Sequence, residues 1–243
     1  MARQLVSPRQ TPGRLCAVPG CTRLATGYRK HCENHRRQAM RHGDPEQRGI
    51  AVGELQGHRK AIERFINRRD DRDRVWSVIE AHWRAFAECA RGELREMTAR
   101  PTYHKPTKEA LESIRNVADT NEPREVMLTL MALFKLWYEK PQRFRSDRAA
   151  MFQAARALRS ITDVHVEKYR NGNTGKLHRV FRDMSPRVLT ILGQWLFKQM
   201  LPLSLNVIRE IEREEEAEKE RVKRLYEVIK GEESSLRGED FSS

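Results

Sequence analysis

The sequence predicts a mainly helical protein with a small metal-binding module near its N-terminus and a charged helix at its C-terminal end. Apolar residues recur every three or four positions after residue 57, three of the four cysteines lie within residues 16–32, and charged residues dominate after residue 206. We expect a flexible arm at 1–15, a zinc-binding module at 16–48, a short glycine-containing linker at 49–57, a helical domain at 58–205 and a charged helical tail at 206–243.

The charge of the chain is strongly positive and unevenly distributed. Lys and Arg number 47 against 34 Asp and Glu, which gives a formal net charge of +13. Residues 209–243 hold 8 basic and 12 acidic side chains, so the preceding part is more basic than the total indicates. Such a surface attracts polyanions, of which nucleic acid is the commonest inside a cell, although a basic surface can also serve solubility.

No segment of the sequence resembles a signal peptide or a membrane span. Residues 1–10 lack the apolar core of a signal peptide, and the most apolar windows, 126–134 and 188–197, are shorter than the roughly 20 residues of a membrane span. We therefore expect a cytoplasmic, nucleoid-associated protein without a membrane partner. In a reducing compartment, clustered cysteines indicate a metal site rather than disulfides.

The helical pattern can be divided into segments. The strongest helical pattern begins at the acid-rich residues 70–73 and ends before Pro101. Acidic residues at a helix start interact favourably with the helix macrodipole, so we interpret this cluster as a helix start rather than as a carboxylate metal site. Further helices are expected at 107–118, at 123–139 with Pro123 in its first turn, and at 147–160 after a Ser146 cap. Another helix follows Ser185 and ends at Pro202, and a charged helix covers 203–230.

The N-terminal cysteines and a histidine have the spacing of a structural zinc site, Cys16-x4-Cys21-x10-Cys32-x2-His35. Two close pairs joined by a short loop supply the four nitrogen and sulfur ligands of tetrahedral Zn²⁺, and four protein ligands leave no position for a catalytic water. A Pro-Gly pair at 19–20 permits the tight turn between the first two cysteines. His31 and His42 are alternatives to His35 as the fourth ligand.

The segments CAVPGC (16–21), CENHRR (32–37) and RHGDP (41–45) resemble the small zinc-binding module of bacteriophage and mobile-element proteins, often found beside HNH endonuclease domains. The resemblance covers about 30 residues. It implies that the module assists nucleic-acid binding, and we expect Arg36, Arg37 and Arg41 to contact DNA. The catalytic histidines and asparagine of an HNH centre do not follow, so the resemblance implies DNA contact rather than cleavage.

Residues 123–200 resemble a winged helix-turn-helix, because the helices predicted at 107–118, 123–139 and 147–160 are followed by a predicted β-hairpin with strands in 162–170 and 176–184. At 100° per residue, the helix at 147–160 has a basic, polar face with base-reading chemistry, opposite an apolar face, although Phe152 falls inside the polar face. A solvated basic face is the alternative. The expected DNA contacts in this region are Arg143, Arg145, Arg148, Gln153, Arg156 and Arg159 near the helix and Lys168, Arg170, Lys176, Arg179 and Arg182 in the wing.

The sequence thus favours a sequence-selective double-stranded DNA-binding protein of a phage, plasmid or mobile element, acting as a regulator or initiator. The alternative is a zinc-containing subunit of a larger nucleoprotein complex, such as an RNA-guided (CRISPR-type) effector that reads a short duplex motif, with RNA as a further partner. An HNH-related nuclease comes third, because we find no catalytic motif and expect no enzyme. The tail, with apolar Val222, Leu225 and Ile229, is expected either to dock on a second copy or another protein, or to be a solvated helix.

Overall fold

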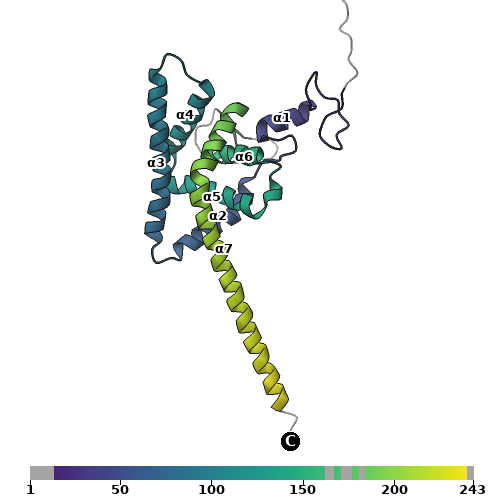
Figure 1. Ribbon diagram of the computed structural model, residues 1–243, viewed down its shortest axis with the longest axis vertical. Coiled ribbons are helices and arrows are strands. Elements are labelled where there is room, and N and C mark those ends of the chain that lie inside the picture. The colour runs from purple at the N-terminus through teal and green to yellow at the C-terminus, as the bar shows by residue number, and fades with distance from the viewer. Residues whose placement is uncertain (1–13, 162–166, 171–176, 181–183, 240–243) are drawn as a thin grey trace, which may run out of the picture.

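The computed structural model of the protein describes residues 14–161, 167–170, 177–180 and 184–239. This part of the chain is mainly helical, as predicted, and most of the expected arm lies outside it (Figure 1). The elements in chain order are α1 (Glu33–His42), α2 (Val52–Asn67), α3 (Arg72–Ala99), α4 (Lys105–Thr120), α5 (Pro123–Glu139), the 3-10 turn η1 (Pro141–Arg143), α6 (Asp147–Ser160), β1 (Glu167–Arg170), β2 (Leu177–Val180) and α7 (Pro186–Glu239).

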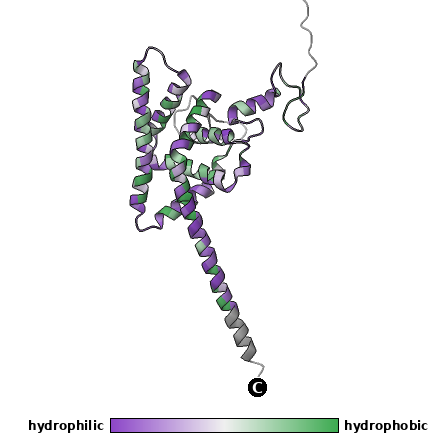
Figure 2. Ribbon diagram, in the orientation of Figure 1, coloured by the Kyte–Doolittle hydropathy of each residue, from purple (hydrophilic) through white to green (hydrophobic). Residues whose placement is uncertain are grey.

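Helix α5 forms the centre of the core. Every residue from Val126 to Leu136 is buried, and α2, α3, α6 and α7 all pack against this helix (Figures 1 and 2). A helix that is apolar on all sides is stable only when it is enclosed. Pro123 occupies the first turn, where its missing N–H is not needed, and the helix has the predicted bounds.

Helix α2 begins inside the segment that was predicted to be a linker. The side chain of Glu54 accepts the backbone N–H of Ala51 at 2.8 Å, which satisfies a free donor at the start of the helix. Gly53 and Gly57 are exposed and lie within α2. The linker prediction is wrong for residues 52–57 because this capping interaction and the buried Leu55 outweigh the poor helix propensity of two glycines.

Helix α6 has the predicted bounds, and Ser146 caps it by accepting the N–H of Ala149 at 3.1 Å. Its predicted role as an open recognition helix is not supported, because Phe152 is fully buried and Gln153 is only 2% exposed. The helix lies between α5 and α7, and its small residues allow a close approach. At the contact with α7, a Cβ added to Gly193 would lie 2.4 Å from the carbonyl oxygen of Met151.

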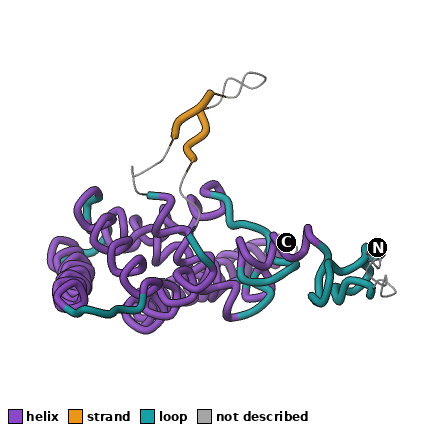
Figure 3. The backbone as a smooth tube through the Cα atoms, turned by 90° about the horizontal axis from the view of Figure 1, so that it is seen from above, coloured by secondary structure: helices purple, strands orange, loops and turns teal. Residues whose placement is uncertain are grey.

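The strands β1 and β2 pair antiparallel, with Glu167 opposite Val180 and Arg170 opposite Leu177. Figure 3 shows the paired strands standing clear of the helices. The predicted turn and the outer ends of the predicted strands, including Lys176 and Arg182, lie outside the described residues. A winged helix, in which the hairpin accompanies an exposed recognition helix, is not seen in the part of the chain that the structure describes.

Helix α7 continues without a break through Pro202, where a helix end was predicted. Proline removes one backbone hydrogen bond, but Pro202 is exposed, so water can solvate the carbonyl group that is left unpaired. Ile208 and Ile211 are buried in the core, and all described residues from Arg213 to Lys230 are exposed. Within the described ranges, no helix is long and apolar enough to cross a membrane.

Candidate metal centre

The structure brings the side chains of Cys16, Cys21, Cys32 and His35 together. Their ligand atoms all lie within 4.8 Å of one another. Nδ1 of His35 is 3.3 Å from Sγ of Cys16 and 3.5 Å from Sγ of Cys32. Tetrahedral coordination with ordinary zinc bond lengths requires donor separations of about 3.6–3.8 Å, so the four groups can hold one metal ion after small adjustments.

Local backbone geometry aims these donors at one point. Gly20 adopts a φ of +74°, and the N–H of Cys21 donates to the carbonyl of Val18 at 3.1 Å, which makes the tight turn predicted between the first two cysteines. Cys32 is the N-cap residue of α1, and His35 follows three positions later in the first helical turn. This spacing places the thiol and the imidazole on the same side of the helix.

The module has almost no apolar core of its own. Apart from the cysteines, Val18 is its single buried hydrophobic residue among those described. A segment of this size needs an additional source of stability, and coordination of a metal ion supplies it in small cysteine-rich modules. The donor set and the lack of a core therefore both fit a structural metal ion held by three thiolates and one imidazole.

The thiols differ in how readily they ionise. Burial raises the pKa of the Cys16 thiol, but hydrogen bonds with the backbone N–H groups of Cys32 and Val18 and with the side chains of His35 and His31 together outweigh it and lower the pKa to about 5. For Cys21, the Arg23 amide acts in the lowering direction, yet burial and the two neighbouring sulfurs leave its pKa raised. A bound cation would favour the thiolate form of all three cysteines.

The other two candidate histidines do not join the cluster. The Nδ1 atom of His31 is buried without a hydrogen-bond partner among the described residues. His42 lies at the far end of α1, where Gln153 donates to its Nδ1 at 3.2 Å. Burial lowers the pKa of His42 to about 4, and the positive charges of Arg156 and Arg41 act in the same direction. Its imidazole is therefore neutral at pH 7 and belongs to the contact with α6.

Two glutamines join the module to the helical body. Gln153 also accepts the N–H of Ile50 at 3.2 Å through its side-chain oxygen. Gln47, fully buried, accepts the N–H of Arg145 at 3.0 Å and donates to the carbonyl of Arg48 at 2.6 Å. Gln153 was predicted to read bases, but both ends of its side chain are used within the protein.

The remaining predicted DNA contacts fall into groups. Arg36 and Arg37 both pair with Glu33, whose pKa their hydrogen bonds lower to about 2. Arg143 pairs with Glu54 at 2.9 Å. Arg156 and Arg159 are half-buried on α6. For the residues predicted in the hairpin, the structure describes only the backbone of Lys168, Arg170 and Arg179.

Four arginines gather where α1 and the following loop meet η1 and α6, and we call them the seam arginines: Arg41, Arg48, Arg145 and Arg148. All four are exposed, and their side chains form no ion pair within the described residues. Arg48 was not among the predicted DNA contacts, because nothing in the sequence indicates that its loop folds against α6. The module and the residues just before it add four further exposed basic residues without an ion pair in the described ranges, Arg14, Arg23, Arg29 and Lys30.

In the comparisons with known proteins, no family model, no curated protein and no solved structure matches the chain. The functional assignment therefore depends on the chemistry of the residues described above.

Proposed function

We propose that this protein binds duplex DNA, with a structural zinc ion in the Cys16, Cys21, Cys32 and His35 cluster, and that it acts as a site-selective regulator or initiator of a phage, plasmid or mobile element. The cluster supports a metal ion, and three thiolates with one imidazole favour zinc. The resemblance of the module to those of phage proteins supports the biological setting.

The observation that carries the proposal is the excess of basic over acidic residues in the module and in the segment that includes the seam. Residues 51–139 contain 16 Lys and Arg against 15 Asp and Glu, and many of these charges form ion pairs, such as Arg59 with Glu125 and Arg84 with Glu80. Residues 14–50 contain eight basic and three acidic residues, and residues 140–160 contain six and one. Positive charge that acids do not compensate therefore concentrates on the module and the seam.

Such charge suits contact with the phosphate backbone. Arginines on a surface neutralise phosphates and release counterions, which makes binding steeply salt-dependent. The buried Gln47 and Gln153 fix the end of α1 and the loop after it against the body, so Arg41 and Arg48 are held beside Arg145 and Arg148. Because Gln153 is buried, we assign this region to contact with the phosphate backbone of DNA. Selectivity for a DNA sequence then requires other side chains or the shape of the DNA.

The test measures duplex binding by fluorescence anisotropy over a range of salt concentrations. A variant with all four seam arginines changed to Gln should bind more weakly, and its salt slope should fall by about 3–4 if each residue contacts one phosphate. The control changes four arginines that are exposed and paired with acids, Arg84, Arg100, Arg213 and Arg224. Both variants lose the same charge, so equal losses of affinity would contradict the proposal.

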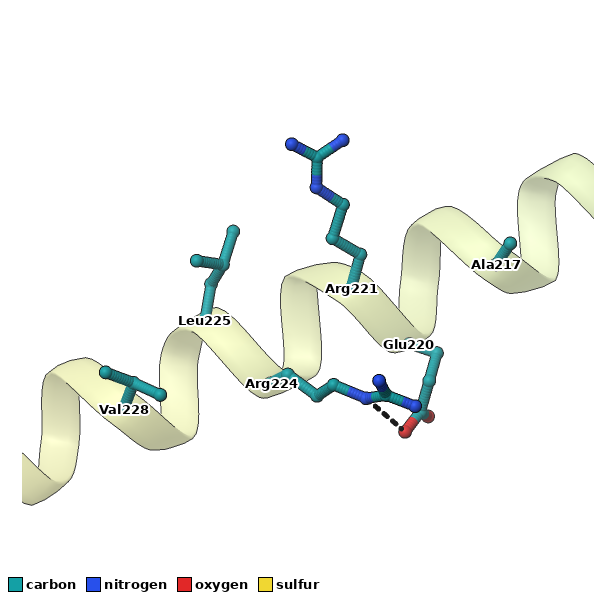
Figure 4. Close-up of a pocket in the computed structure, with 6 residues that line it drawn as sticks. All are labelled: Ala217, Glu220, Arg221, Arg224, Leu225 and Val228. Carbon is teal, nitrogen blue, oxygen red and sulfur yellow. Dashed lines mark hydrogen bonds and ion pairs between the residues drawn. The ribbon is translucent and has the colours of Figure 1, made fainter.

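A second candidate is a subunit of a larger nucleoprotein assembly, and the exposed part of α7 favours it. Val222, Leu225 and Tyr226 are each more than half exposed on a helix that extends beyond the body (Figure 1). Figure 4 shows that the shallow surface around Leu225 and Val228 is built by α7 alone, with side chains pointing into solvent. Purification from the native host with sequencing of bound nucleic acid separates the candidates, because discrete DNA sites favour the first and a stable RNA with companion proteins favours the second.

A further inference from the structure

A groove between α3 and α4 is lined by three arginines. Arg91 and Arg95 come from the C-terminal half of α3, and Arg115 comes from α4. Leu94 and Ala99 contribute apolar surface to the same groove, together with Thr98. Positions 91, 94, 95 and 98 share one helix face because they are three, four and seven residues apart.

The acidic side chains around this groove form ion pairs with Arg91, Lys108 and Arg100. Arg91 bonds to both Glu88 and Asp119. The carboxylate of Glu112, one turn before Arg115, pairs with Lys108 at 3.9 Å. Glu96 is likewise 3.8 Å from Arg100, so both acids pair with basic residues outside the groove.

Two guanidinium groups of the groove have no ion-pair partner of their own among the described residues. Arg115 is half-buried, and its side chain donates only to the neutral amide of Asn116 at 3.2 Å. Arg95 is exposed and forms no ion pair within the described part of the chain. A partly buried positive charge beside an apolar surface is poorly solvated, and an anion that enters the groove would stabilise it.

We infer that the α3–α4 groove binds a phosphate group, and that this phosphate belongs to the backbone of duplex DNA. The planar fork of arginine matches two phosphate oxygens, and two such groups can hold one phosphodiester. The groove lies on the side of the body away from α1, so it forms a second contact separate from the seam (Figure 1). Only the assignment to DNA rests on the proposed function.

The experiment compares the full chain with an Arg95→Gln, Arg115→Gln variant. The first measurement is the salt slope for a duplex of about 30 base pairs, and the second is the shift of arginine side-chain NMR signals on titration with inorganic phosphate. The matched control is Arg84→Gln, Arg100→Gln, which removes two paired arginines, one in α3 and one at its C-cap. We expect the groove variant to lower the salt slope by about one to two and the control to leave it unchanged.

Each outcome decides a separate point. A normal salt slope in the groove variant would overturn the DNA assignment, while the loss of binding in the seam variant would still support the proposed function. Signals of Arg95 and Arg115 that respond to inorganic phosphate but not to the duplex would assign the groove to a small phosphate compound instead of DNA. If no duplex binds to the unmodified chain, the proposed function fails, and the phosphate titration alone then supports or rejects the groove as a phosphate site.

Discussion

The amide of Gln153 on α6 donates a hydrogen bond to Nδ1 of His42 at the end of α1, with 3.2 Å between the two nitrogen atoms. The bond joins residues 111 positions apart and requires an unprotonated Nδ1. One of the hydrogen bonds that attach the module to the helical body therefore depends on a histidine that stays neutral.

Acidification should weaken this attachment. The folded protein holds His42 with a pKa of about 4, against an ordinary value of 6.5. Between these two values the unfolded chain binds a proton that the folded chain does not bind, so the free energy of unfolding falls as the pH decreases from 6.5 toward 4. Urea unfolding of the metal-loaded protein at several pH values measures this slope. A His42→Asn variant should have a shallower slope, and parallel curves for the two proteins would contradict the assignment.

Gly43, next to His42, should not tolerate a side chain. Its φ of +86° lies in the left-handed region, and an added Cβ would be 2.9 Å from Cγ of Phe152. We expect Gly43→Ala to lower the free energy of unfolding by about 1–2 kcal/mol from the backbone conformation, with a further loss from the contact. Gly57→Ala is the control, because that position is in a helix with open space around it. The control should gain about 0.5–1 kcal/mol, and equal effects would contradict both the backbone strain at Gly43 and its contact with Phe152.

The metal cluster should bind one zinc ion per chain. Cys16→Ser removes a buried ligand, so elemental analysis should show loss of zinc, and limited proteolysis should cut the module more readily. Cys89→Ser is the matched control, because Cys89 is exposed on α3 and outside the cluster. The helical body has a separate core and should keep its cooperative unfolding in both variants. Full zinc content in the Cys16 variant would disprove the ligand assignment.

The crossing of α6 and α7 should depend on Gly193. Because the Met151 carbonyl leaves no room for a Cβ, Gly193→Ala must separate the helices, and we expect a loss of about 1–3 kcal/mol in unfolding free energy. Gly92→Ala, in α3 with nothing within 4 Å of the added atom, should be neutral or stabilising. Thermal unfolding of the two variants beside the unmodified protein provides the measurement. A Gly193 variant as stable as the Gly92 variant would show that the helices have space to adjust.

Local signals in the sequence identified several elements well. Pro123 and Ser146 mark the starts of α5 and α6 because each satisfies or avoids a free backbone donor in the first turn. The choice of His35 over His31 and His42 also follows from local geometry, since a cysteine at a helix start and a residue three positions later face the same way.

Features that depend on distant contacts were not accessible to sequence reasoning. A helical wheel places Gln153 and Phe152 on the polar face of α6, but it does not show that α1 and its loop cover that face. Pro202 would break a helix in isolation, whereas the packing of Met200 and Ile208 in the core holds one helix across it. Whether a charged side chain has a partner is also decided by tertiary contacts, as Arg48 and Arg115 illustrate.

The uninterrupted α7 has a mechanical consequence. At 1.5 Å per residue, the helical stretch from Arg213 to Glu239 extends about 40 Å beyond the last buried turn, and it is continuous with a helix anchored in the core. A partner molecule bound near the C-terminal end of α7 would be held at a fixed distance and a fixed rotation relative to the seam arginines. Inserting two residues after Lys219 would turn such a molecule through about 200° about the helix axis while displacing it by only about 3 Å.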